Sequence, residues 1–381
     1  MKKFLKAAAL IAAAVLPLSI SACTESEKQS NNSKYFYSMG TQATLLVPQS
    51  SGSEEQFNAL AGEVEALLDE VENSISATVK GSYIYKFNEA EAGAKVQLDK
   101  IAYDVLSLAM ETYELTEHYY NPAVYHSVKS YGFPLSLIYP TTLPKEQQVQ
   151  AFRELASHFD EVELSETGGR YYATKPEFTV TVGGAEYSLA VDLGGIGKGW
   201  CADRVDELMR WYGYDYGYFN FGSSSMSLKN YAYSADGAYV LQPRDPRGNG
   251  YFCSLKVFEC NLSTSGDYEQ YYEIEGKRYC HIINPFTGKP IETGVASVTV
   301  IDGSAAENDA LTTALSCMDK RTAVDFINGA PHIFSYRTVV MLVFEGGVGK
   351  IITNRPSEIS GARYDIANSV ENGRIVLNDV A

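Results

Sequence analysis

The stretch Val191-Asp192-Leu193-Gly194-Gly195-Ile196-Gly197-Lys198-Gly199 places four glycines around one lysine. Its apolar start predicts the end of a strand, and the glycines predict a tight loop that can approach a ligand closely, since no Cβ stands in the way. Apolar residues then recur at helical spacing from Trp200 to Tyr212, and Gly213 predicts the end of that helix. A strand, a glycine loop and a helix N-terminus together are typical of an anion site. Taken alone, the stretch fits an ordinary turn onto a packed helix better.

The glycine stretch is not a Walker A motif. No Ser or Thr follows Lys198, and the spacing of the glycines differs from that motif. Other segments of the chain therefore have to decide between an anion site and a simple turn.

The first 22 residues have the pattern of an export signal. Lysines precede an apolar run, residues 4–20, that is too short for a comfortable membrane span, and small residues precede Cys23. Such a cysteine is typical of a bacterial lipoprotein, so we expect lipidation of Cys23, with an ordinary signal peptide as the alternative. The polar composition of residues 24–34 predicts a flexible tether, so that residues 23–34 link the lipid to the rest. We expect an extracytoplasmic protein, lipid-anchored to a bacterial membrane.

Charge and cysteine content exclude several classes of protein. The formal net charge is −16, and it becomes −19 when residues 1–22, which hold three lysines and no acid, are removed. Such acidity argues against nucleic acid and against electrostatic attachment to anionic lipid. Five cysteines remain after Cys23 without C-x-x-C spacing, which predicts neither a zinc site nor a complete disulfide framework. Cys253 and Cys260 either pair or are buried small hydrophobes.

The order of predicted elements indicates an α+β fold. Amphipathic patterns predict helices over Glu54–Ile75, from about Asp99 to before Asn121, and just after Pro144. Strands are expected at residues 43–47, 178–182, 239–242, 295–301 and 339–344. We expect mixed or antiparallel sheets flanked by helices, in one large domain or two packed lobes.

A second site element follows the strand at residues 295–301. Ser304 to Glu307 is a capping box, which predicts a helix start. Asp309 and Thr313 lie four residues apart on that helix and share one face, so they present two hard oxygens of the kind that Mg²⁺ or Ca²⁺ prefers. The alternative is an acid favoured by the helix N-terminus and a threonine bonded back to a carbonyl, which by spacing alone is the better interpretation.

A third element surrounds His281. The chain has five histidines, and this one precedes an apolar pair and a Pro-rich turn, residues 285–290. It is either a half-buried, hydrogen-bonded histidine or a general base or phosphate partner.

Together these segments resemble the ApbE family of FAD:protein FMN transferases, from about Tyr35 to the C-terminal region. The motifs that carry the resemblance occur in the order of the family: Ser38-Met39-Gly40-Thr41, Tyr120-Asn121-Pro122-Ala123-Val124 with Tyr131-Gly132-Phe133, Asp192 to Gly199, Phe219-Asn220-Phe221-Gly222-Ser223, Thr264-Ser265-Gly266-Asp267-Tyr268, His281-Ile282-Ile283-Asn284-Pro285, and Asp309 to Leu315.

The resemblance implies a fold and a set of site residues. The fold is an ApbE-like, T-fold-like catalytic unit of two packed lobes over residues 35–381. The metal is Mg²⁺, with Asp309 and Thr313 as side-chain ligands and Gly195 as a backbone ligand. The positions that match FAD contacts are Met39, Tyr119, Tyr120, Asn121, Asp192, Lys198 and Ile283.

The resemblance also implies a reaction. FMN is transferred from FAD to a Thr or Ser hydroxyl of an acceptor protein that bears a flavinylation motif, and AMP is released. We expect Lys198 to act on the phosphates and His281 to accept the hydroxyl proton. The acceptor is expected to be a redox protein attached to the same membrane. The alternatives are an Mg²⁺-dependent FAD pyrophosphatase, which gives FMN and AMP, and a non-catalytic flavin-binding lipoprotein.

Overall fold

The computed structural model describes residues 30–134 and 140–378. The predicted signal peptide, Cys23 and most of the tether lie outside these residues. No helix among the described residues has the length and hydropathy needed to cross a bilayer.

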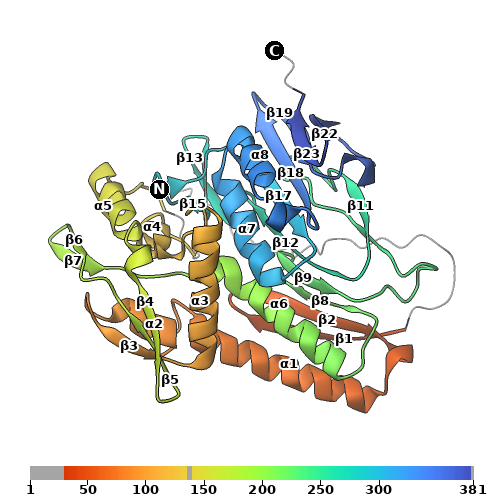
Figure 1. Ribbon diagram of the computed structural model, residues 1–381, viewed down its shortest axis with the longest axis horizontal. Helices are drawn as coiled ribbons and strands as arrows, with labels where there is room; N and C mark the ends of the chain where they lie inside the picture. The colour runs from red at the N-terminus through yellow and green to blue at the C-terminus, as the bar shows by residue number, and fades with distance from the viewer. Residues whose placement is uncertain (1–29, 135–139, 379–381) are drawn as a thin grey trace, which may run out of the picture.

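A nine-stranded sheet forms the centre of the molecule (Figure 1). Neighbouring strands are antiparallel, apart from the parallel pair at the end of the sheet formed by the last two strands. In spatial order the strands are β1 (Asn31–Ser38), β2 (Thr41–Pro48), β8 (Tyr218–Phe221), β9 (Ser225–Leu228), β12 (Cys260–Gly266), β17 (Val295–Ile301), β18 (Thr338–Glu345), β19 (Val348–Thr353) and β21 (Asp365–Ile366). All seven residues of β17 are buried, so both faces of the sheet are covered there.

Three helices cover one face of this sheet. They are α1 (Glu54–Ile75), α6 (Gly194–Trp211) and α7 (Ala305–Cys317), and Figure 1 shows α6 and α7 side by side across the strands. The predicted apolar face of α1 is correct, since Phe57, Leu60, Val64, Leu68 and Val71 are buried in the main core. The strand residues that face these helices complete that core.

The opposite face of the sheet carries a second, smaller core. Leu228 and Leu342 of the central sheet pack there against Tyr239 and Leu255. The latter two belong to a small sheet of β10 (Tyr239–Leu241), β11 (Ser254–Val257) and β20 (Ile359–Ser360). The α+β class with largely antiparallel sheets is therefore confirmed.

The remaining elements surround the central layers. The helices are α2 (Tyr83–Glu89), α3 (Lys100–Leu115), α4 (Tyr125–Ser130), α5 (Glu146–Ala156), α8 (Lys320–Gly329) and α9 (Pro331–Phe334). The smaller sheets join β3 (Lys95–Leu98), β5 (Arg170–Thr174) and β4 (Glu163–Thr167); β6 (Thr179–Val182) and β7 (Ala185–Ser188); β13 (Tyr271–Ile274) and β14 (Lys277–Cys280); β15 (Ile283–Asn284) and β16 (Lys289–Pro290); and β22 (Asn368–Glu371) and β23 (Arg374–Leu377). Short 3₁₀ turns lie at 49–51, 122–124, 159–161 and 356–358.

Most predicted elements lie within a few residues of their expected positions. The helix expected after Pro144 begins two residues later, because Lys145 is extended and takes the capping position. Cys253 and Cys260 do not pair. Both are free thiols, and Cys253 is buried in the second core.

Candidate active site

The glycine stretch is the first part of α6 rather than a loop before it. The predicted loop, with a helix starting near Trp200, is therefore wrong, and the reason is close helix packing. A Cβ added at Gly199 would lie 2.2 Å from the carbonyl oxygen of Ala305 in α7, and one added at Gly197 would lie 2.6 Å from Cδ1 of Ile75 in α1. The glycines thus let α6 approach both helices at distances that a side chain would prevent.

Asp192 closes the N-terminus of α6, where the sequence predicted an anion. Its Oδ1 accepts a hydrogen bond from the Gly194 N–H at 2.8 Å. The predicted strand end at Val191 is wrong: the side-chain amide of Asn88 bonds both backbone groups of Val191, at 2.8 Å each, in place of a neighbouring strand. Burial raises the pKa of Asp192, and the Gly194 N–H and Lys198 oppose that shift.

Asp203 and Ser304 fix the start of α7 against α6. The Ser304 hydroxyl accepts from the Glu307 N–H at 3.3 Å, which confirms the predicted cap. The carboxylate of Glu307 pairs with Arg337 instead of returning to the cap. Asp203 of α6 accepts from the Ser304 hydroxyl and from two backbone N–H groups of the first turn of α7, at 2.7 to 3.0 Å. A carboxylate at a helix N-terminus is favourable, so this contact holds the two helices in one arrangement.

Asp309 is the buried carboxylate of the site. It is 3% exposed, and its Oδ2 accepts from the Gly199 N–H at 3.1 Å across the contact between α6 and α7. Burial raises its pKa, while Lys198, the Gly199 N–H and a hydrogen bond with Ser225 act in the opposite direction. Its few donors leave oxygen lone pairs free to bind a cation.

Thr313 lies one helical turn after Asp309, as predicted. Its Oγ1 donates to the Asp309 carbonyl oxygen at 3.1 Å, the bond of an ordinary helical threonine, and keeps lone pairs for a second partner. A Cβ added at Gly195 would lie 3.3 Å from Oγ1 of Thr313 and 3.4 Å from Cε2 of Tyr120. The two helices therefore bring Gly195, Asp309 and Thr313 together.

These donors fit a hard divalent cation. Carboxylate, hydroxyl and carbonyl oxygens are the ligands that Mg²⁺ prefers. Across residues 30–134 and 140–378, no group of three or more His, Cys, Asp or Glu side chains is arranged to hold a metal. Tyr120 is 2% exposed, and its hydroxyl finds no hydrogen-bond partner in the described part of the chain, although it lies in the field of Asp309 and Asp192. A buried hydroxyl left without a partner there is consistent with a site that binds a further group.

Lys198 is a positively charged side chain that acts on several groups of the site. Its Nζ donates to the Gly194 carbonyl at 2.9 Å. Its charge opposes the rise in pKa that burial causes at Asp192, Asp309 and Glu269, and adds to the lowering at His281, so these four groups lie in its electrostatic field. The predicted role of Lys198 beside phosphate oxygens is compatible with this place.

His281 is neutral in this environment. Burial and the charge of Lys198 lower its pKa to about 4, although an interaction of the imidazole with the backbone of Gln270 opposes that shift. Its Nδ1 is buried and has no hydrogen-bond partner among the described residues. An uncharged imidazole can accept a proton at neutral pH, as the predicted base requires.

Glu269 is a further candidate residue of the site, which the sequence motifs did not single out. It is exposed to solvent, yet desolvation by the surrounding protein raises the pKa of its carboxyl to about 7, with Lys198 and Arg244 opposing the shift and Asp309 adding to it. Glu269 directly follows the Thr264–Tyr268 motif, which was the available signal. The sequence does not indicate that Glu269 and Lys198 interact, because the two residues are far apart along the chain.

The other predicted FAD positions lie around this centre. Met39 has a positive φ of 47° in the turn between β1 and β2, and its Sδ would lie 3.8 Å from a Cβ added at Gly197. Ile283 is buried in β15, and the half-buried Tyr119 packs edge-on against Phe286, with ring centroids 4.7 Å apart.

Asn121 is engaged by the fold itself. Its Oδ1 accepts from the Ala123 N–H at 2.8 Å, and its Nδ2 donates to the Ala156 carbonyl at 3.0 Å. Its amide therefore orders the turn before α4 and ties that turn to α5, and contact with FAD stays a prediction.

An α+β fold that gathers oxygen donors and one lysine where two helices meet defines a class of protein suited to a hard cation and an anionic ligand. The chain belongs to the ApbE family, whose model matches residues 39–335.

Known proteins similar to the chain share this family. The FAD:protein FMN transferase of Treponema pallidum is 29% identical over 269 residues, covering 68% of this chain and 71% of the relative. That of Vibrio cholerae is 27% identical over 317 residues, covering 79% and 86%. Among solved structures, a histidine-to-glycine variant of the flavin transferase ApbE from Vibrio cholerae has a TM-score of 0.68 at 25% identity, covering 85% of this chain and 97% of that one. The ApbE protein from Thermotoga maritima has a TM-score of 0.69 at 23% identity, covering 88% and 97%.

Proposed function

We propose that this protein is an Mg²⁺-dependent FAD:protein FMN transferase that attaches FMN to a Thr or Ser hydroxyl of an acceptor protein and releases AMP. The observation that carries the proposal is the buried Asp309 carboxylate. It accepts a hydrogen bond from the Gly199 N–H, lies one helical turn before Thr313, and is in the electrostatic field of Lys198. The FAD:protein FMN transferases among its relatives support the same reaction.

Asp309, Thr313 and the backbone oxygen of Gly195 would hold Mg²⁺. When bound, Mg²⁺ supplies Lewis-acid polarisation of a phosphoryl oxygen and stabilises negative charge. The ligands come from two helices fixed to each other by Asp203, so the protein preorganises the site before the cation binds.

The residues of the chain have separate roles in the transfer. Lys198 offsets the charge of the FAD diphosphate. The acceptor hydroxyl oxygen forms a bond to the phosphorus of the FMN half, the bond from that phosphorus to the bridging oxygen breaks, and AMP leaves with the electron pair. The neutral imidazole of His281 accepts the hydroxyl proton. Met39, Tyr119, Tyr120, Asn121, Asp192 and Ile283 are proposed to contact FAD.

We place the enzyme outside the cytoplasm, tethered to a bacterial membrane through a lipid on Cys23. The acceptor is then a redox protein on the same membrane face. The export signal and the polar residues 24–34 support this location.

The test combines the chain lacking residues 1–22 with FAD and Mg²⁺, with and without a protein that bears the acceptor motif. AMP is followed by chromatography and flavin fluorescence on a denaturing gel. We expect AMP release that depends on the acceptor, and a fluorescent acceptor band. AMP with free FMN and no labelled band would instead identify a pyrophosphatase, and intact FAD under every condition would identify a binding protein.

A further inference from the structure

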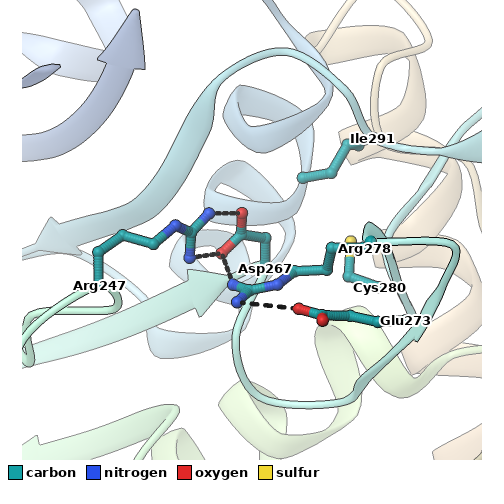
Figure 2. A pocket seen from close by; sticks show the side chains of 7 residues that line it. Arg247, Asp267, Glu273, Arg278, Cys280 and Ile291 are labelled. Atoms are coloured by element: carbon teal, nitrogen blue, oxygen red, sulfur yellow. Dashed lines mark hydrogen bonds and ion pairs between the residues drawn. The ribbon is translucent and has the colours of Figure 1, made fainter. Parts of the chain in front are cut away.

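A cluster of ionic side chains lies next to the site, and the proposed transfer gives it no role. Figure 2 shows Arg247 and Arg278 converging on Asp267, with Glu273 beside Arg278. Arg247 bonds both carboxylate oxygens of Asp267, one of them at 2.8 Å. Nη1 of Arg278 lies 3.6 Å from Oδ1 of Asp267, and its Nη2 lies 3.8 Å from Oε1 of Glu273. These side chains line a cavity of about 280 Å³ whose wall includes Cys280.

The cluster fastens the hairpin of β13 and β14 to the central sheet. These two strands form a sheet of their own, and an isolated hairpin is at best marginally stable in water. Asp267 directly follows the central strand β12, and its N–H donates to the Ala296 carbonyl in β17 at 3.2 Å. Arg278 lies in β14, so its pair with Asp267 joins the hairpin to the most buried part of the sheet. Packing of Tyr272 and Tyr279 on neighbouring aromatic rings is a second tie.

The hairpin is flanked by two titratable candidates of the site, Glu269 and His281. Glu269 and Gln270 lead into β13, His281 follows β14, and the His281 N–H bonds the Gln270 carbonyl at 3.0 Å. Cys280, the last residue of β14, lines the cavity of the cluster. The next residue, His281, lies in the electrostatic field of Lys198.

We propose that Asp267, held by Arg247 and Arg278, is a positioning residue that sets the place of His281 in FMN transfer. The inference rests on the proposed role of His281. A carboxylate bound by two N–H groups of one guanidinium has a defined direction as well as charge. When that direction is lost the hairpin can shift, and a displacement of about 1 Å at a reacting group can cost on the order of 100-fold in rate.

The first test is Asp267→Asn in the full chain, assayed with FAD, Mg²⁺ and an acceptor protein. This change removes the charge and keeps the shape. We expect kcat to fall at least about 10-fold while KM for FAD stays within about twofold, because the FAD and metal ligands lie on other elements. Asp236→Asn, which removes a surface pair with Lys256, is the control and should leave kcat unchanged. An unchanged kcat in Asp267→Asn overturns the inference.

A double-mutant cycle separates positioning from general loss of structure. If Asp267 acts through His281, adding Asp267→Asn to His281→Ala lowers kcat no further than His281→Ala alone. An equal loss in both backgrounds means that Asp267 acts elsewhere, which overturns the inference and leaves the transferase intact. A wild-type kcat in His281→Ala refutes the role of His281 and the inference with it. If Asp267→Asn does not fold, Arg278→Gln, which leaves the pair of Asp267 and Arg247, takes its place in the cycle.

Discussion

Asp309 is the only charged side chain among the proposed metal ligands. Asp309→Asn keeps an oxygen acceptor for the Gly199 N–H and removes the charge. We expect FMN transfer to fall on the order of 100-fold or more, since no other proposed ligand is charged. Added Mg²⁺ should raise the Tm of the wild type and leave that of the variant unchanged, because a ligand stabilises the state that binds it.

Asp325→Asn, at an exposed position of α8, is the matched control and should keep both responses. A wild-type Mg²⁺ response in Asp309→Asn would remove this residue from the metal site.

The pKa of His281 makes stability depend on pH in a defined direction. In the folded protein it is lowered to about 4 from an ordinary value of 6.5, so between these values the unfolded chain binds more protons than the native protein. The free energy of unfolding therefore decreases as pH falls from 6.5 to 4, by up to about 3 kcal/mol, because protonation favours the unfolded chain. His281→Gln should lose less stability than the wild type over this range, as measured by urea unfolding at pH 7, 6, 5 and 4.

The exposed His332 supplies the comparison, since His332→Gln should retain the wild-type slope. Parallel curves for the wild type and His281→Gln would show that burial of this imidazole costs nothing in acid.

Among the elements, the contact between α6 and α7 depends on one missing side chain. Gly199→Ala places a methyl group 2.2 Å from the Ala305 carbonyl oxygen, so the helices must separate. We expect a loss of about 1–3 kcal/mol in the free energy of unfolding, and weaker Mg²⁺ binding because Gly195 moves away from Thr313. Gly62→Ala in α1 is the control: its Cβ meets nothing within 4 Å, and helix propensity predicts a gain of about 0.5–1 kcal/mol. Equal effects of the two changes in denaturant unfolding would contradict a packing role for Gly199.

The elements also show what local pattern predicts and what it does not. The periodicity of residues 54–75 predicts α1 correctly because burial on one face decides that helix. The glycines of α6 predict a loop, since glycine is a poor helix former, and close packing against α7 and α1 explains why glycines stand in this helix. The strand end predicted at Val191 is wrong for a related reason. The backbone of Val191 bonds the side chain of Asn88, about a hundred residues away in the sequence, and not a neighbouring strand.

The same distinction applies to the site. The spacing of Asp309 and Thr313 places them on one helical face, which can be deduced from the sequence alone. Their approach to Gly195, and the electrostatic effect of Lys198 on Glu269, depend on how α6, α7 and the β13–β14 hairpin are packed. The motif at residues 264–268 points to this segment, but it does not relate Glu269 to Lys198 without those contacts.

For the molecule as a whole, the two cores share strands. Alternate residues of β18 face opposite sides, so that Val339 and Met341 belong to the main core while Val340 and Leu342 belong to the second. Disruption of one core therefore exposes one face of strands whose other face packs in the second core, and so destabilises both cores. We expect the described residues to unfold as one cooperative unit.

Leu342→Ala tests this coupling, because it opens the second core on the side of the sheet away from α6. Both tryptophans of the chain, Trp200 and Trp211, lie on α6, so their fluorescence reports on the other side. We expect a loss of about 2–5 kcal/mol, with the denaturation midpoints from tryptophan fluorescence and from far-UV circular dichroism lowered equally. Val348→Ala, at a position 60% exposed in β19, should leave both midpoints in place. A fluorescence midpoint that stays at the wild-type value while the dichroism signal is lost earlier would mean that the two faces of the sheet unfold independently.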